Sequence, residues 1–280
     1  LFLLFLIILT LFFSGKIERP DLLLLIYSVL AACQVLLLRA DNWFRQGRRR
    51  EIFRDVIFPV IAVLVIFDSL GLIVHKINPR DIDPLLIRLD YILFQGYPTV
   101  MIEAMADPLL TDVLQIAYTT YYFLPITLGL ILKARGMDAA FDRALFLILF
   151  CFYLSYIGYI LFPALGPRYT MDHLQTGELR GIFIAGPVQE FLNRLEGIKR
   201  DAFPSGHTGV ALVVSWLGRQ YHRGFFLVTL PVVSLLVFST VYCRYHYVVD
   251  VIGGMMLAAI TIILGKPIYG YWEERRDTRN

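Results

Sequence analysis

Residues able to do chemistry are concentrated in three short stretches of the chain. They read Gly-Pro-Arg-Tyr at 166–169, Phe-Pro-Ser-Gly-His-Thr at 203–208, and Tyr-Cys-Arg-Tyr-His-Tyr-Val-Val-Asp at 242–250. Together they supply two imidazoles, one carboxylate and two guanidinium groups. Such a set can bind an anion, provide a nucleophile and donate a proton.

The third stretch contains a histidine and an aspartate four residues apart. If a helix begins near His246, then His246 and Asp250 share one helical face, with Cβ atoms about 5–6 Å apart. The carboxylate would accept an imidazole N–H and leave the lone pair of the other ring nitrogen free to attack. We expect Asp250 to point inward, because a lipid-facing acid is costly. The alternative is a buried pair that only holds two helices together.

The second stretch has the pattern of a helix start. Ser205 follows a proline and suits an N-cap, and Gly206 allows the backbone to approach a ligand closely. Free N–H groups at a helix start bind phosphate, so His207 would stand beside an anion site as a general acid. The alternative is a capped helix that carries an incidental histidine.

Two arginines supply the positive charge. The forked guanidinium groups of Arg168 and Arg244 match phosphate oxygens, although either residue alone could equally be an arginine reaching the membrane interface. The three cysteines are scattered, and no Cys–His or carboxylate cluster has metal-ligand spacing. We therefore predict no metal and no cofactor, with charge supplied by arginines and a helix start.

The composition indicates which elements must position these residues. Of the 280 residues, 58% are hydrophobic and 18% are charged, and the mean hydropathy is +0.64. Soluble domains have about 45–50% apolar and about 25% charged residues. The long apolar blocks and the net charge of only +3 exclude a cytosolic globule, a disordered chain and a nucleic-acid binder. They indicate a membrane protein.

The apolar blocks predict an all-α transmembrane bundle of about eight spans, since only helices satisfy their own backbone in a bilayer. We divide the chain into N-terminal spans with an interfacial segment (1–108), a catalytic core (109–265) and a cytoplasmic tail (266–280). The first block opens on Leu rather than Met, so we expect residues to precede it. The blocks are Leu1–Phe13, Leu22–Leu38, Val56–His75, Leu109–Leu132, Ala144–Phe162, Ser205–Leu217, Phe225–Val241 and Tyr247–Leu264.

Charge predicts the orientation of the bundle. Connections on one side hold 15 Lys and Arg in 50 residues, whereas those on the other side hold 11 in 88. Because the dense side faces the cytoplasm, both termini are expected there, in a bacterial inner or plasma membrane. All three motif stretches then lie on the extracytoplasmic face.

Two segments of the long outer connections and three tyrosines lead to further expectations. Pro187–Phe203 has the pattern of an amphipathic helix and Pro84–Phe94 is similarly apolar, so each suits either the membrane surface or packing on the bundle. For Tyr118, Tyr121 and Tyr122, an aromatic belt at the membrane interface is favoured over an interior position.

The motifs resemble those of the type 2 phosphatidic acid phosphatase superfamily, which comprises integral-membrane lipid phosphatases and phosphotransferases. Pro-Ser-Gly-His at 204–207 matches its second signature, and His246-x-x-x-Asp250 followed by Val-Ile-Gly-Gly matches the end of its third. The resemblance covers roughly Leu109–Leu264. It implies that His246 is the nucleophile, forming a phosphohistidine, that Asp250 orients it and that His207 protonates the leaving alkoxide. It also implies a metal-free phosphate site formed by Ser205, Gly206, Arg168 and Arg244.

The chain departs from the family pattern in two places. The first signature places a Lys seven residues before an Arg-Pro pair, whereas here Leu161 precedes Arg168 and Tyr169 follows it. The third signature begins Ser-Arg, but Thr240 occupies the Arg position. If this stretch is helical, Arg244 lies one turn beyond Thr240 on the same face and could reach the same phosphate. Gly-Pro-Arg with Arg-Tyr-His-Tyr is more similar to the branch containing inositol phosphorylceramide synthase and its bacterial relatives.

Three functions follow from these residues. The first is a lipid phosphate phosphatase, in which water cleaves the phosphohistidine. The second is a phosphotransferase, in which an acceptor hydroxyl does so, and the third is a non-catalytic lipid-phosphate binder or carrier. The complete His, His and Asp set argues against the binder, which would need only arginines. The expected partner is a lipid phosphate substrate, not a nucleic acid.

Overall fold

The computed structural model describes residues 1–40, 51–195 and 198–277, and these residues form helices with no strand among them. The predicted all-α class is therefore confirmed for this part of the chain. Arg45, Arg48, Arg49 and Arg50, which contribute to the predicted cytoplasmic charge, lie outside the described residues. The helices are α1 Phe2–Phe12, α2 Pro20–Ala40, η1 Phe53–Ile57, α4 Phe58–Leu70, α5 Val74–Ile77, α6 Asp83–Phe94, α7 Pro98–Met101, η2 Ile102–Met105, α8 Pro108–Thr119, η3 Thr120–Tyr122, α9 Leu124–Ala134, α10 Asp138–Leu161, α11 Pro167–Thr170, η4 Asp172–Leu174, α12 Ala185–Leu195, α13 Gly206–Tyr221, α14 Arg223–Tyr242 and α15 Val248–Asp277.

Helices long and apolar enough to cross a membrane number four in the described residues. These are Pro20–Arg39, Asp138–Leu161, Arg223–Tyr242 and Val248–Arg275, and the pair α8–η3 and α9 makes a fifth if it is one bent span. Helices α1, α4 and α13, with 11, 13 and 16 residues, are shorter than a usual span. Their three spans, and hence the count of eight, remain a prediction.

One predicted span is bent rather than straight. The block Leu109–Leu132 forms α8, the 3₁₀ turn η3 and α9, with an angle of 50° between the two parts. Pro125 lies in the first turn of α9, where its missing N–H is tolerated but where it cannot continue a preceding helix. The bend therefore ends α8 in the middle of the bundle and turns residues near Thr120 toward the interior.

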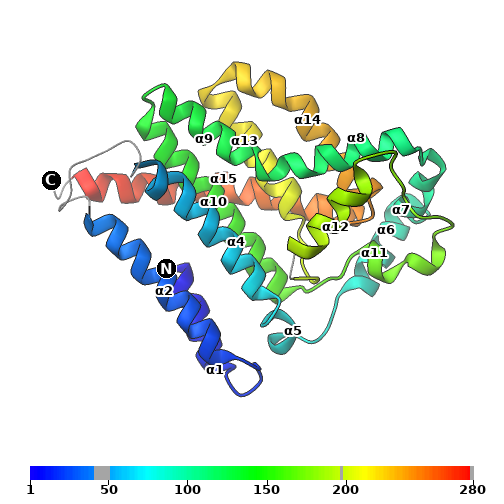
Figure 1. The fold of residues 1–280 in the computed structure, drawn as a ribbon, viewed down its shortest axis with the longest axis horizontal. Helices are drawn as coiled ribbons and strands as arrows, with labels where there is room; N and C mark the ends of the chain where they lie inside the picture. Colours follow the sequence, from blue (N-terminus) through cyan, green and yellow to red (C-terminus); the bar gives the residue numbers. More distant parts are fainter. Residues whose placement is uncertain (41–50, 196–197, 278–280) are drawn as a thin grey trace.

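Helix α13 occupies the centre of the bundle. It packs against α14, α15, α10 and α9, and most of its side chains are buried, including Val210, Val214 and Leu217. Small residues let α15 approach it, because a Cβ at Gly254 would lie 2.5 Å from the carbonyl oxygen of Ser205. Close backbone contact of this kind is what packs helices in lipid. Helices α1 and α2 pack against each other at the edge of the bundle (Figure 1).

Short helices from the two long connections gather at one end of the long helices. Figure 1 shows α6, α7, α11 and α12 there, while the C-terminus lies at the opposite end. Ion pairs and hydrogen bonds join the connections. Asp81 pairs with Arg200 at 2.7 Å, and Glu103 accepts hydrogen bonds from Thr176 and Gly177. The chain between α10 and α13 is thus held down by carboxylates that precede α8.

The two predicted connection helices form with shifted bounds. Pro84–Phe94 corresponds to α6, which buries Leu86 and exposes Leu93. The segment Pro187–Phe203 forms a helix only in α12, which starts at Ala185. Val188 packs against the buried cluster that contains Leu114 and Tyr245, whereas the side chains of 191–197 lie outside the described set. The predicted tail begins as a helix, because α15 continues to Asp277.

Candidate active site

His246 lies in the turn between α14 and α15 and is 3% exposed. Its Nδ1 atom is 2.8 Å from the carbonyl oxygen of Ala202 and 3.5 Å from Oδ2 of Asp250. We predicted that the carboxylate would accept the imidazole N–H, but the closer acceptor is a backbone carbonyl, because α15 starts two residues after His246. A proton on Nδ1 leaves the lone pair on Nε2 free.

Asp250 is fully buried, as its position in the sequence predicted. Its Oδ2 accepts the backbone N–H of Tyr247 at 2.8 Å, in the manner of an acidic side chain that reaches back to the start of its own helix. Its backbone carbonyl accepts the N–H of Ser205 at 3.0 Å. Asp250 therefore ties the first turn of α15 to the first residues of α13.

Ser205 caps α13, as predicted. Its side chain accepts the backbone N–H of Thr208 at 3.3 Å, and this cap begins the helix that carries His207. The ring centroids of His207 and His246 are 5.8 Å apart, so two of the sequence motifs meet. Gly206 has a packing role that was not predicted, because a Cβ there would collide with the hydroxyl of Tyr159.

The rings of three tyrosines surround His207. The ring of Tyr118 stacks on His207 with centroids 4.3 Å apart, that of Tyr121 lies at 4.1 Å, and that of Tyr122 meets it edge-on at 6.5 Å. The belt interpretation is wrong for Tyr118, which is 2% exposed, and for Tyr121. The bend between α8 and α9 directs this turn inward, and the stacked rings hold the imidazole plane.

Arg244 ends α14 in a left-handed turn. Its φ is +64°, its N–H bonds to the carbonyl of Val241, and the N–H of Tyr245 bonds to the carbonyl of Thr240. These two bonds form a Schellman motif, whose left-handed position is usually a glycine. The prediction that Thr240 and Arg244 share a helical face is therefore wrong. The turn instead carries the chain back toward His246.

The two arginines are neighbours. The N–H of Arg168 bonds to the carbonyl of Arg244 at 2.9 Å, and the Arg168 guanidinium lies 4.7 Å from the ring centre of Tyr245. Gly166 makes this approach possible, since a Cβ there would lie 2.5 Å from the Tyr245 carbonyl oxygen and its φ is +88°. The Arg244 guanidinium is 3.4 Å from a carboxylate oxygen of Glu103. Arg168, Arg244, His207, His246 and Asp250 thus belong to one cluster of contacts.

Burial sets the protonation of His246. Loss of solvent lowers its pKa to about 4, with a smaller lowering from the positive charge of Arg168 and opposition from Asp201 and the Ala202 carbonyl. At neutral pH the imidazole is uncharged, the state a nucleophile requires. The pKa of Glu103 is lowered overall. Burial raises this pKa, but hydrogen bonds from Thr176 and Gly177 and the charge of Arg244 together lower it by more.

Several groups around the site were not predicted. They are the Ala202 carbonyl, Glu103 and Asp83. The carboxylate of Asp83 accepts hydrogen bonds from the backbone N–H groups of Leu165 and Gly166 and from the hydroxyl of Tyr247. An acidic residue at the edge of an apolar segment was a signal for Asp83, but a backbone carbonyl has no signature in sequence. Among the described residues, no group of three His, Cys, Asp or Glu side chains is arranged to hold a metal ion.

Comparison with known proteins identifies the family. The PAP2 superfamily matches residues 85–264, so the chain belongs to the PAP2 superfamily, as its motifs predicted. A PA-phosphatase related-family protein of Dictyostelium discoideum is 25% identical over 199 residues, which are 64% of this chain and 35% of the relative. The chain thus aligns with about a third of that relative's length. No solved structure matches. Membership and the apolar helices fit a membrane protein.

Proposed function

We propose that this protein is a membrane lipid phosphate phosphatase that works through a phosphohistidine on His246. The observation that carries the proposal is the pair of buried imidazoles 5.8 Å apart, one of which is bonded through Nδ1 to the Ala202 carbonyl. Nε2 of His246 is then free to attack phosphorus. His207 stands where a proton can be given to the leaving oxygen.

The reaction follows from these positions in two steps. In the first, Nε2 of His246 forms a bond to phosphorus while the bond to the lipid oxygen breaks, and protonated His207 gives its proton to that oxygen. In the second, water attacks the phosphohistidine, and His207 takes a proton from the water. Inorganic phosphate leaves and both imidazoles return to their starting states. Arg168, Arg244 and the N–H groups after Ser205 would stabilise the charge on the phosphoryl oxygens.

The location of the reaction is part of the proposal. The site is formed by the ends of α10 and α14 and the starts of α13 and α15, and the charge asymmetry favours the extracytoplasmic face for it. In this arrangement α1, α4 and α13 complete eight spans. Exposed apolar side chains of α6, such as Leu89, Ile92 and Leu93, would lie in the membrane interface.

A phosphotransferase is the second candidate, and the enclosure of the site favours it. His246, Asp250 and Arg244 are no more than 9% exposed, and the chain between α10 and α13 covers them through the Ala202 carbonyl and the N–H of Arg168. A transferase must exclude water so that an acceptor hydroxyl resolves the phosphohistidine. The resemblance to the inositol phosphorylceramide synthase branch points the same way.

Phosphate release distinguishes these functions. The purified protein in detergent is incubated with phosphatidate, phosphatidylglycerol phosphate or a polyprenyl phosphate, with and without EDTA. The phosphatase is supported by inorganic phosphate that forms in EDTA, is lost in His246→Ala and persists in the control His173→Ala, whose residue is exposed. Transfer to an added lipid alcohol without phosphate release supports the transferase. No turnover of any donor contradicts both and leaves a lipid-phosphate binder.

A further inference from the structure

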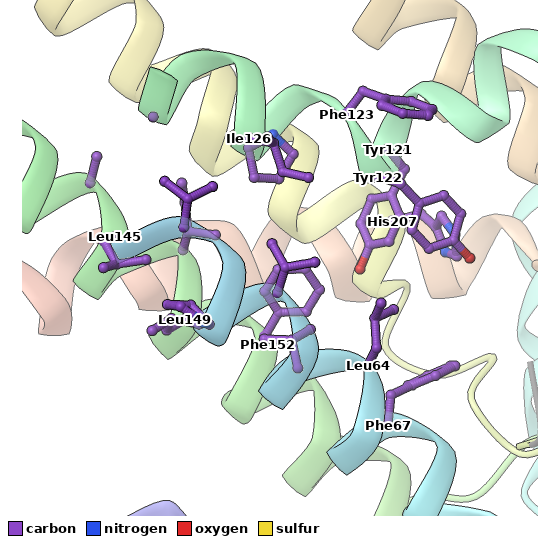
Figure 2. Close-up of a pocket in the computed structure, with 18 of the residues that line it drawn as sticks. Leu64, Phe67, Tyr121, Tyr122, Phe123, Ile126, Leu145, Leu149, Phe152 and His207 are labelled. Carbon is purple, nitrogen blue, oxygen red and sulfur yellow. The ribbon is translucent and has the colours of Figure 1, made fainter. Parts of the chain in front are cut away.

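An elongated cavity of about 190 Å³ begins beside His207 and runs between α4, α9 and α10. Figure 2 shows His207, Tyr121 and Tyr122 at one end and Leu145 toward the other. The walls between these ends are apolar, and they include Leu64, Phe67, Ile126, Leu149 and Phe152. The cavity adjoins the site but contains none of the phosphate-binding arginines, so it is suited to a different part of a substrate.

Ionic groups lie at the far end of the cavity. Asp55 lines this end and pairs with Arg54 at 2.6 Å and with Lys133 at 2.9 Å. The ammonium group of Lys133 also lies 4.6 Å from the ring centre of Phe141, which lines the cavity as well. The apolar walls therefore end at these ion pairs, beside a second cavity that Asp55, Val56 and Lys133 line.

The length of the cavity wall is close to the length of a lipid acyl chain. The wall formed by η1 and α4 runs from Asp55 to Phe67, which at the rise of an α-helix is about 18 Å. The hydrocarbon core of a bilayer is about 30 Å thick, so a chain in one leaflet reaches about 15 Å. One acyl chain of an ordinary membrane lipid therefore has the length that this wall can accommodate.

If the proposed function holds, the chemistry of the site indicates which part of the substrate lies in the cavity. His207 gives its proton to the leaving oxygen, so the carbon skeleton of the departing alcohol must lie on the side of His207 that faces away from the nucleophile. The cavity begins at that residue. Its position predicts a site for the leaving alcohol rather than for the phosphate.

We infer a lateral opening of the cavity from two exposed residues that line it. Leu64 and Phe123 line it, yet they are 37% and 65% exposed. They lie on α4 and just before α9, two helices that both pack against α10. A lipid could therefore pass from the bilayer into the cavity between α4 and α9 without its chain crossing water.

We propose that this cavity binds one hydrocarbon chain of the leaving lipid alcohol, and that α4 selects substrates by chain length. Helix α4 lies before residue 85, where the match to the family begins, so this wall belongs to the part of the chain that the family signatures do not describe. The expected substrate is a phosphate monoester of a glycerolipid with chains of about the length of one leaflet.

Two neighbouring residues of α4 provide a matched test. Val60 lines the cavity, whereas Ile61 does not and is 44% exposed. Phosphate release is measured for wild type, Val60→Phe and Ile61→Phe, with dihexanoyl and dioleoyl phosphatidate in the same mixed micelles. We expect Val60→Phe to lower the ratio of kcat/KM for dioleoyl to dihexanoyl substrate about tenfold, since packing in an apolar pocket is worth about that factor. Ile61→Phe should keep the wild-type ratio.

A second filling variant and a photolabelling experiment keep the test informative if Val60→Phe misfolds. Ala144→Leu fills the opposite wall from α10 and should lower the same ratio. A dioleoyl phosphatidate with a photoreactive group at a chain end should label Leu145 or Phe141 in His246→Gln protein, which cannot turn it over. An unchanged ratio in both filling variants, or labelling confined to outer surfaces, overturns the chain site while leaving the phosphatase intact. Wild-type protein that hydrolyses neither lipid contradicts the proposed function itself.

Discussion

Nδ1 of His246 lies 2.8 Å from the carbonyl oxygen of Ala202, closer than the 3.5 Å that separates it from Oδ2 of Asp250. The proposed nucleophile is therefore oriented by a backbone group from the chain that precedes α13. A carbonyl holds the proton on Nδ1 without any change of charge, and the carboxylate behind it stabilises the positive imidazole that forms during attack.

This geometry predicts a moderate effect of removing the carboxylate charge. Asp250→Asn retains an oxygen that can accept the Tyr247 N–H, and the Ala202 carbonyl still keeps the proton on Nδ1. We expect kcat for phosphate release to fall about tenfold to a hundredfold, less than the roughly 10⁴-fold loss where a carboxylate alone sets the tautomer. His246→Ala should abolish release. Equal losses in the two variants would show that the carbonyl does not hold the ring.

The pH dependence of activity follows from the burial of His246. Because loss of solvent lowers its pKa to about 4, the nucleophile stays neutral down to that pH. It becomes protonated, and inactive, only as the pH falls through about 4. We expect the acidic limb of kcat/KM, which reports the free enzyme, to lie near pH 4. An inflection near the ordinary histidine value of 6.5 would mean that solvent reaches His246, and unfolding must be checked at each pH.

Two substitutions at Arg244 can distinguish the effect of its left-handed backbone from the effect of its charge. Both Arg244→Gly and Arg244→Ala remove a guanidinium from the proposed phosphate site, so both should lower kcat/KM by about 10²–10³-fold. Their stabilities should differ, because glycine adopts a φ of +64° without the cost of about 1 kcal/mol that alanine pays. Thermal unfolding in one detergent measures this difference. An alanine variant as stable as the glycine variant would contradict the role of the turn.

The sequence predicted the parts of the site that depend on local spacing. Ser205 could be recognised as an N-cap from Pro-Ser-Gly, and the order of the apolar blocks indicated that His207 and His246 would meet. Asp250 was expected to be buried because an acid in lipid is costly. Each of these inferences uses only neighbours in sequence or the alternation of spans.

The parts that could not be predicted depend on the path of the backbone in three dimensions. A left-handed conformation at Arg244 has no signal when the residue is not glycine, so continued helix was the natural expectation. Tyr118 and Tyr121 resemble interfacial residues until the bend before Pro125 turns them inward. The cavity beside α4 arises only when α4 and α9, which are far apart in the sequence, both pack on α10.

The next prediction concerns Asp112, which holds the chain between α10 and α13 in place. Its carboxylate accepts the backbone N–H groups of residues 182–185 at 2.7–3.1 Å, so it satisfies the start of α12 from another helix. Asp112→Ala should leave these groups unpaired and lower the local opening free energy by about 2 kcal/mol, or about thirtyfold in amide exchange. Hydrogen–deuterium exchange of 182–185 measures the effect. The exposed Asp172→Ala serves as the control, and unchanged protection in Asp112→Ala would remove Asp112 from this role.

The role of His207 as an acid can be tested through the leaving group. A proton is needed most by a poor leaving group, such as the alkoxide of diacylglycerol, and least by an activated phenolate. His207→Ala should therefore slow hydrolysis of phosphatidate by about 10²–10⁴-fold and slow hydrolysis of p-nitrophenyl phosphate much less. Tyr118→Leu, which removes the ring stacked at 4.3 Å on this imidazole, should produce a weaker form of the same selectivity. If both substrates slow equally in His207→Ala, the residue binds phosphate instead of donating a proton, and the leaving alcohol need not lie on its side of the site.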